Sequence, residues 1–123
     1  MKLDFDSPAG TLSIAAYAPG WIRVGDQRLE QACVVEPGGV RLDLLPATLA
    51  EFDATHAAAL AGQGAEIVLL GTGAEQRFID YALVDFLAER GVGLEIMDTG
   101  AACRSFNLLA AEGRAVLAAL YMI

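Results

Sequence analysis

The alternation of short apolar runs with helical stretches in residues 66–123 limits the possible folds of this chain most. The runs are "EIVLL" (66–70), "LEIMD" (94–98) and "RAVLAALYMI" (114–123). Their length and continuous apolar character are typical of strands buried on both faces. Strands separated by a helix pair in parallel, because a parallel connection needs a crossover of a dozen or more residues. This half of the chain therefore predicts an α/β domain in which strands and helices alternate.

Two helices are expected between these strands. After the first strand, apolar side chains recur at helical spacing and Gly91 follows them as a stop, so the spacing predicts a helix over 75–90. A second helix begins near Gly100 and buries Phe106. We expect the first two strands to be parallel neighbours, with the first helix crossing between them.

Residues 1–45 follow a different pattern, in which short β-compatible stretches alternate with the turn sequences "APG" and "PGG". The stretches are "LSIAAYA" (12–18), "WIRVG" (21–25), "RLEQACVVE" (28–36) and "VRLDLL" (40–45). This pattern predicts an N-terminal meander of antiparallel strands. Thr48 then caps a predicted helix over 49–61. No repeat or linker divides the chain, so we expect a single domain over residues 1–123.

The charge balance excludes several classes of partner. A net charge of −8 disfavours nucleic acid and anionic membrane surfaces, and the eight basic residues form no run.

The longest apolar run is about half as long as a membrane-spanning helix requires. The N-terminus "MKLDFDSPAG" does not resemble a signal peptide, so we expect a cytoplasmic protein.

Two glycine-containing corners follow the first two strands of the predicted sheet and mark a candidate site. They are Gly71-Thr72-Gly73 and Asp98-Thr99-Gly100. Ligands of open α/β sheets bind outside the carboxyl ends of the strands, where both corners fall. A helix N-terminus and Arg104 at the same edge favour an anion. We predict a surface concavity over 98–104 that faces the first corner, and we include Cys103 and Asn107 among its candidate residues.

The same residues have ordinary structural interpretations. Glycine often follows a strand because the turn needs a positive φ, and Asp98 or Thr99 can cap a helix. Arg104 can pair internally with one of three carboxylates, those of Glu95, Asp98 and Glu112. The first corner lacks the third glycine of a dinucleotide fingerprint and the Gly-Lys-Ser/Thr of a phosphate loop, so no nucleotide cofactor is expected.

Cys103 is the one candidate nucleophile. Its place in the first turn of a helix, beside Arg104, favours a lowered thiol pKa. Cysteine is also among the residues most often buried, and His56 lies on a different predicted helix, so we favour a structural role. Cys33 is far away in the sequence and no Cys-x-x-Cys occurs, so no metal site is expected.

The stretches "LLGTG" (69–73) and "GVGLEIMDTGAACRSFNLLAAEGRAVLAAL" (91–120) together resemble a known family. It is the family of small proteins of unknown function that includes the mitochondrial complex I (NADH dehydrogenase) assembly factor three and its bacterial and archaeal relatives. Ser105 and Phe106 stand where the family has Thr and Tyr or Phe, and the N-terminal half agrees more loosely. The positions that match the family pattern include Gly91, Glu95, Met97, Asp98, Thr99, Ala101, Ala102, Cys103, Arg104, Asn107, Glu112 and Arg114.

This resemblance implies a three-layer α/β fold around a central mixed β-sheet, and it implies no enzyme activity. Three hypotheses for function follow. The first is a non-catalytic adaptor or assembly factor with protein partners, acting on membrane or respiratory complexes. The second is a small anionic-ligand-binding protein with its site at the 71–73 and 98–104 edge. The third, with the least support, is a cysteine-dependent enzyme that uses Cys103.

Overall fold

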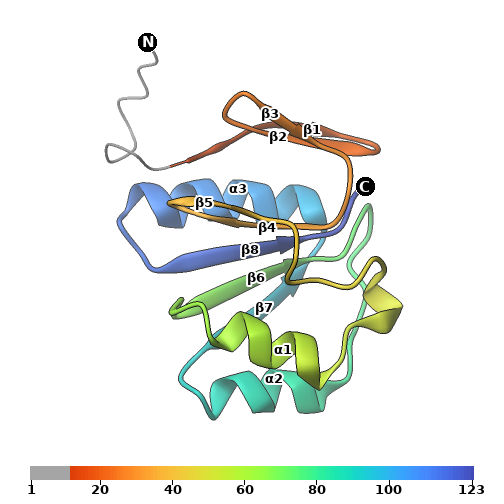
Figure 1. Cartoon of the computed structure of the whole chain (residues 1–123), viewed down its shortest axis with the longest axis vertical. Helices are drawn as coiled ribbons and strands as arrows, with labels where there is room; N and C mark the ends of the chain where they lie inside the picture. The colour runs from red at the N-terminus through yellow and green to blue at the C-terminus, as the bar shows by residue number, and fades with distance from the viewer. Residues whose placement is uncertain (1–11) are drawn as a thin grey trace.

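A computed structural model describes residues 12–123, so the part of the predicted meander in residues 1–11 lies outside the described residues. Eight strands, three α-helices and one 3₁₀ helix follow one another along the described chain (Figure 1). The strands are β1 (Ile14–Ala18), β2 (Trp21–Val24), β3 (Gln27–Leu29), β4 (Cys33–Glu36), β5 (Gly39–Arg41), β6 (Ile67–Gly71), β7 (Gly93–Met97) and β8 (Val116–Leu120). The helices are the 3₁₀ helix η1 (Leu49–Glu51), α1 (Ala54–Ala61), α2 (Tyr81–Ala88) and α3 (Thr99–Ala111).

The central sheet is mixed, with the strand order β5-β4-β8-β6-β7. Strand β6 pairs in parallel with β7, from Ile67 opposite Gly93 to Gly71 opposite Met97, as the sequence predicted. It also pairs in parallel with β8, which is antiparallel to β4. The carboxyl ends of the three parallel strands therefore lie at one edge of the sheet.

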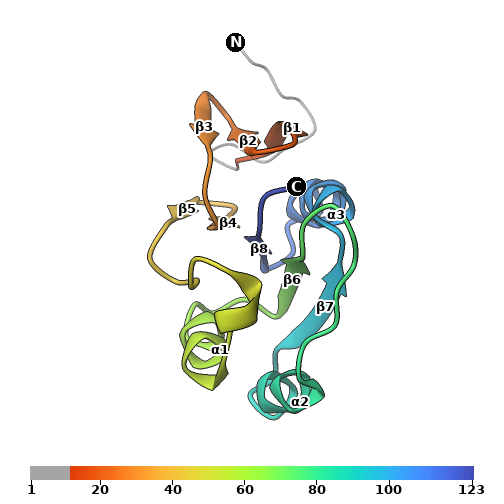
Figure 2. The same ribbon diagram turned by 90° about the vertical axis from the view of Figure 1, so that its right-hand side faces the viewer.

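Two hydrophobic cores lie on opposite faces of this sheet, so the domain has three layers (Figure 2). Helices α1 and α2 cover one face, where Leu60 and Leu87 pack with Leu70. Helix α3 covers the other face together with a separate three-stranded sheet, β1-β2-β3. Phe106 of α3 is fully buried beside Ile22 of that small sheet. The three-layer α/β fold and its C-terminal β-α-β-α-β portion are as expected.

The N-terminal meander differs from the prediction, because its strands belong to two sheets. The stretch 28–36, predicted as one strand, divides between β3 in the small sheet and β4 in the central sheet. Strand β4 has three consecutive buried residues, Cys33–Val35, as expected of a strand covered on both faces. The predicted strand 40–45 is reduced to β5, and Leu42 beyond it is 46% exposed.

Two of the three predicted helices, those over 49–61 and 75–90, differ from the prediction, because their α-helical parts begin later than expected. Residues 74–80 form no helix, and α2 begins after Asp80, whose side chain accepts a hydrogen bond from the Ala82 N–H at 3.0 Å. The helix predicted over 49–61 is divided by Phe52 into η1 and α1. In each case an aspartate that can cap a helix stands inside the apolar pattern, and the helix begins there.

The close approach of β6 to α3 gives a test of this packing. A Cβ atom at Gly71 would lie 2.9 Å from Oγ1 and 3.0 Å from Cα of Thr99, both shorter than ordinary contacts. We expect Gly71→Ala to lower the free energy of unfolding by about 1–3 kcal/mol through overpacking. A Cβ atom at Gly38 would meet nothing within 4 Å, so Gly38→Ala should change it by less than about 0.5 kcal/mol in urea denaturation. Equal effects of the two substitutions would contradict this packing.

Candidate functional site

The two predicted corners lie in direct contact, at the carboxyl ends of β6 and β7. The backbone N–H of Thr99 donates to the carbonyl of Gly73 at 2.9 Å, and the Gly73 N–H donates to Thr99 Oγ1 at 2.8 Å. The Thr99 hydroxyl donates in turn to the carbonyl of Tyr121 at 2.6 Å. Thr99 is fully buried, so this side chain joins the ends of β6 and β8 to the start of α3.

The polar groups of the first corner are also satisfied within the protein. Thr72 Oγ1 donates to the Glu75 carbonyl at 2.7 Å and accepts from the Arg77 N–H at 3.0 Å. The Thr72 backbone N–H donates to the Met97 carbonyl at 2.9 Å. These bonds hold residues 72–77 in a bent loop rather than in the helix that the sequence predicted.

The second corner is filled from the side of the small sheet. A Cβ atom at Gly100 would lie 3.2 Å from the Tyr17 ring and 3.3 Å from the Arg104 guanidinium, which accounts for glycine at this position. Asp98 caps α3 by accepting from the Ala101 N–H at 2.9 Å. The two corners are thus brought together, while a surface concavity at 98–104 and binding of a ligand there stay predictions.

Arg104 is exposed and bonds to a hydroxyl group. Its Nη1 donates to the Tyr17 hydroxyl at 2.5 Å. Within residues 12–123 it forms no ion pair with Glu95, Asp98 or Glu112, the three internal partners considered from the sequence. The positive charge of Arg104 is therefore not neutralised by a carboxylate of the described chain.

Asn107 has a structural contact that the sequence did not suggest. Its Oδ1 accepts from the Ile14 N–H at 2.7 Å and its Nδ2 donates to the Ile14 carbonyl at 2.9 Å. The amide thus pairs with the backbone of β1 as a neighbouring strand would, and it attaches the small sheet to α3.

The cysteine environment opposes nucleophilic chemistry. Cys103 is 1% exposed, and burial raises the pKa of its thiol to about 12, with the nearby Arg104 charge too weak to offset this. The lowered pKa expected from the sequence is therefore wrong. Burial also raises the pKa of Cys33 to about 12, and the Cys103 thiolate adds to that shift.

His56 is not placed to serve Cys103 as a base. It belongs to α1, which covers the other face of the central sheet, and its Nδ1 accepts from the Asp53 N–H at 3.1 Å. Among residues 12–123, no group of three His, Cys, Asp or Glu side chains is arranged to hold a metal ion.

Two adjacent hollows at the same sheet edge were missed by the sequence reasoning. They lie on the side of α1 and α2, have volumes of about 690 Å³ and about 800 Å³, and share Leu49 and Arg77 in their walls. The first also borders Thr72 and Tyr121, and the second lies between η1 and residues 77–80. The one residue that could have indicated the second hollow is Asp80. It can cap a helix, and a helix that begins after Asp80 leaves residues 77–80 outside the helix, where they can form a wall of the hollow. We call the two hollows together the edge groove.

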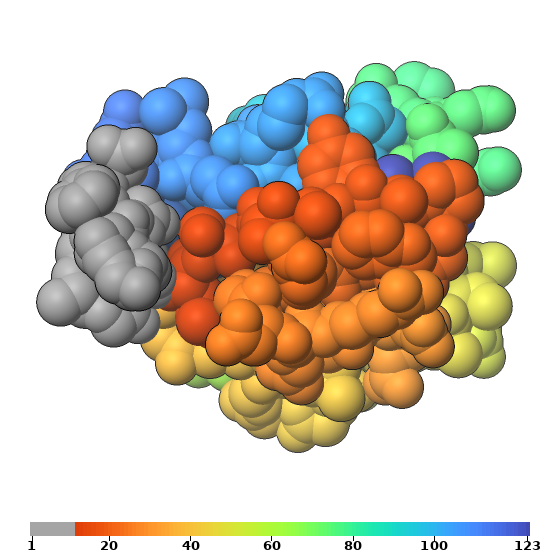
Figure 3. All heavy atoms as spheres, turned by 90° about the horizontal axis from the view of Figure 1, so that it is seen from above, coloured from red at the N-terminus to blue at the C-terminus, as the bar shows by residue number. Residues whose placement is uncertain are grey.

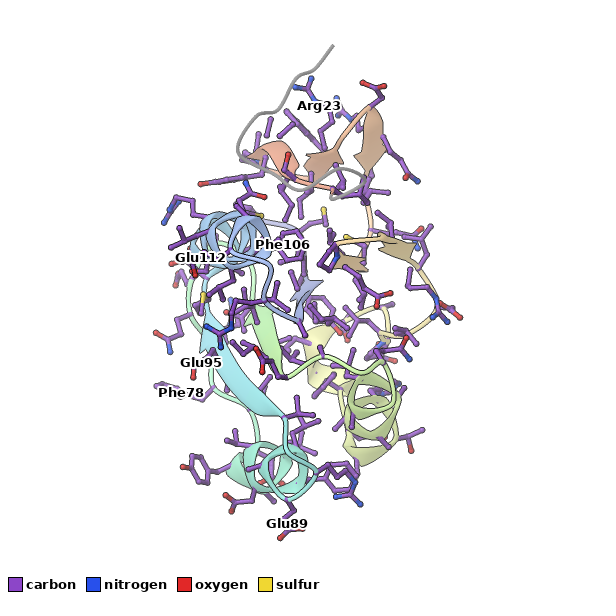
Figure 4. The ribbon with its side chains drawn as sticks, turned by 90° about the vertical axis from the view of Figure 1, so that its left-hand side faces the viewer. Arg23, Phe78, Glu89, Glu95, Phe106 and Glu112 are labelled. Atoms are coloured by element: carbon purple, nitrogen blue, oxygen red, sulfur yellow. The ribbon has the colours of Figure 1, made fainter. Side chains whose placement is uncertain are left out.

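Each hollow of the edge groove has an exposed large apolar residue in its wall. Phe78 is 89% exposed and lines its second hollow, Leu42 lines its first, and Tyr81 follows at the start of α2 with 71% exposed. Figure 4 shows Phe78 projecting outward beyond β7, on the side of the molecule away from α1. In Figure 3 the residues near 50 (yellow) and near 76 (green) project at the same end of the molecule. Exposed apolar residues in the walls of a groove are typical of an interaction surface.

The raised pKa values of the two buried thiols make the free energy of unfolding depend on pH. Each pKa is raised from 9.0 in the folded state, so the folded protein holds these protons more tightly than the unfolded chain. The stabilisation is fully present below pH 9 and is lost as the pH rises towards 12. We expect the free energy of unfolding to fall by about 1–2 kcal/mol per thiol between pH 8 and pH 10.5, measured by urea denaturation.

The variant with both Cys33→Ala and Cys103→Ala is the control, and its stability should fall less over the same range. The folded wild-type protein should also react slowly with iodoacetamide at pH 8, because both thiols are buried and protonated. Rapid alkylation of the folded protein would restore the cysteine-dependent hypothesis.

Comparisons with known proteins agree with this fold and with the assembly-factor resemblance. A protein of Danio rerio described as NADH dehydrogenase (ubiquinone) 1 alpha subcomplex assembly factor 3 is 30% identical over 122 residues, which cover 94% of this chain and 66% of that protein. An uncharacterized protein of Rhodobacter capsulatus is 36% identical over 115 residues, with 91% of this chain and 86% of that protein covered. The crystal structure of a Bordetella parapertussis protein matches with a TM-score of 0.84 and 37% identity, over 93% of this chain and 98% of that one.

No helix within residues 12–123 has the length and apolar character needed to cross a membrane.

The family described as "Protein of unknown function (DUF498/DUF598)" matches residues 14–121, nearly the whole of the described chain. The protein therefore belongs to the DUF498/DUF598 family.

Proposed function

We propose that this protein is a non-catalytic adaptor or assembly factor that acts by binding another protein. The observation that carries this proposal is its similarity, over 94% of its length, to a protein named as an assembly factor of NADH dehydrogenase. We extend the proposal to the assembly of membrane or respiratory complexes, with the chain acting in the bacterial cytoplasm. The bacterial relative in Rhodobacter capsulatus supports the bacterial setting.

The surface of the domain supports binding of a protein. An adaptor needs exposed apolar groups that lose contact with water in the complex, since burial of apolar area is the main source of affinity. Phe78 and Tyr81 supply such groups, and aromatic side chains are enriched among the residues that contribute most to protein interfaces.

Affinity capture tests the proposed function. The immobilised protein should retain subunits of a multisubunit membrane complex from a Rhodobacter capsulatus lysate, identified by mass spectrometry. An unrelated acidic domain of similar size and charge is the matched control and should retain none of them. A thermal shift of several degrees with one anionic metabolite, together with no specifically retained protein, would contradict the proposal.

The second candidate function is binding of a small anion at the 71–73 and 98–104 edge. The observation that favours it is the exposed Arg104 guanidinium, which pairs with no carboxylate of residues 12–123 and lies near the N-terminus of α3. A helix end contributes about 0.3–1 kcal/mol and a charge-assisted hydrogen bond about 1.5–3 kcal/mol to such binding. These contributions correspond to affinities in the millimolar range or somewhat tighter.

Calorimetric titration with citrate and inorganic phosphate tests this second function. Arg104→Ala should abolish binding while lowering stability by less than about 1 kcal/mol, as is usual at exposed positions. Arg23→Ala is the control, because Arg23 is exposed on the small sheet, between two residues, Ile22 and Val24, that face the core shared with α3. Figure 4 shows Arg23 at the outer end of the molecule, beyond α3 and Phe106. Equal binding by wild type and Arg104→Ala, or a large loss of stability, would show that the corner is only structural.

A further inference from the structure

We propose that the edge groove is a docking surface for a basic amphipathic segment of a partner protein, with Phe78 as its main apolar contact. The proposal rests on the function proposed above and identifies the surface and the chemistry of the partner. Three observations carry it: where the exposed apolar residues lie, how the walls are held, and which charges border the groove.

Exposed apolar residues lie in the walls of both hollows of the edge groove. Four large apolar side chains of the described chain are strongly exposed, and two of them, Leu42 and Phe78, line the edge groove. Tyr81 is adjacent to the lining residue Asp80, and only Leu108 belongs to α3. An aromatic ring that is 89% exposed gains much from burial in a complex, because aromatic side chains carry large apolar areas.

The shape of the edge groove suits a segment of polypeptide. Its two hollows follow one another and share Leu49 and Arg77, so their walls are continuous. The first hollow reaches Tyr121 and Met122 beyond β8, and the second reaches Asp80 at the start of α2. A polypeptide segment can contact both hollows at once, with apolar side chains entering each.

The walls are held in place before any partner binds. Residues 75–77 are fixed by the hydrogen bonds of Thr72 Oγ1, and η1 by the Thr48 hydroxyl, which donates to the Glu51 carboxylate at 2.8 Å. The Tyr121 hydroxyl donates to the Pro46 carbonyl at 3.1 Å and ties the loop before η1 to the end of the sheet. A surface held in this way loses little conformational entropy on binding.

The charged residues around the edge groove indicate the charge of the partner segment. Exposed carboxylates occur on both sides of the second hollow: Asp80 lines one wall, and Glu51 and Asp53 are chain neighbours of Phe52, which lines the opposite wall. Arg77 is the cation that lines it. Together with the net charge of −8, this border favours lysine and arginine on the incoming segment. It disfavours a second copy of this acidic chain as the occupant.

A selection from a displayed library of random 16-residue peptides tests the proposal, with the folded full-length protein as the target. Enriched peptides should carry a net positive charge and at least two large apolar residues. Their binding, measured by fluorescence anisotropy, should weaken at least tenfold with Phe78→Ser. The matched control is Leu108→Ser, which removes an exposed apolar side chain from α3 and should change affinity less than twofold.

The proposal is overturned if no peptide is enriched, if the enriched peptides are acidic, or if Phe78→Ser binds them as well as wild type. Equal thermal unfolding of the two serine variants and the wild type confirms that loss of binding is not loss of folding. Sedimentation velocity examines self-association: a wild-type dimer that Phe78→Ser converts to a monomer would make a second copy the occupant and overturn the proposal.

Failure of the docking surface and failure of the adaptor function give different results. If Phe78→Ser still retains the proteins captured by the wild type from the lysate, the adaptor function stands and the edge groove is not its docking surface. If the wild type retains no specific protein while the peptide results are as expected, the edge groove binds basic segments and the adaptor function fails.

Discussion

The arrangement of this domain depends on the buried hydroxyl of Thr99. It accepts from the Gly73 N–H and donates to the Tyr121 carbonyl, so one side chain satisfies backbone groups at the ends of two parallel strands. Leaving such groups unpaired in a core costs about 1–3 kcal/mol each. Because Thr99 is also the first residue of α3, the same bonds fix where that helix starts and therefore where it carries Arg104 and Asn107.

The second half of the fold could be predicted because its signals are strong and local. Continuous apolar runs identified β6, β7 and β8. The segments between these strands are long enough for the crossover connections that parallel strands need, so parallel pairing could be predicted. The division of residues 28–36 between two sheets could not be predicted, since a β-compatible stretch does not show which sheet it joins. The late start of α2 at Asp80 was visible as a capping residue, but the apolar spacing around Phe78 favoured a longer helix.

The candidate site was predictable in position but not in detail. The sequence placed both corners at one sheet edge, and they do lie in contact there. It could not show that Thr72, Thr99 and Asn107 bond to backbone groups, because residue type does not reveal the partner of a polar side chain. The edge groove lies beyond Thr72 on the α1 and α2 side, where its walls come from four separate stretches of the chain, within 30–32, 42–52, 72–80 and 121–122.

The attachment of the small sheet through Asn107 has a consequence for motion. Strands β1, β2 and β3 pair with one another, and they meet α3 through the amide of Asn107, the hydroxyl of Tyr17 and the hydrophobic core that they share with Phe106. Because they have no strand pairing with the central sheet, we expect them to open together as a cooperative unit before the central sheet unfolds. Amide hydrogens of β2 would then exchange with solvent through a partial opening, whereas those of β8, between β4 and β6, exchange only when the whole domain unfolds.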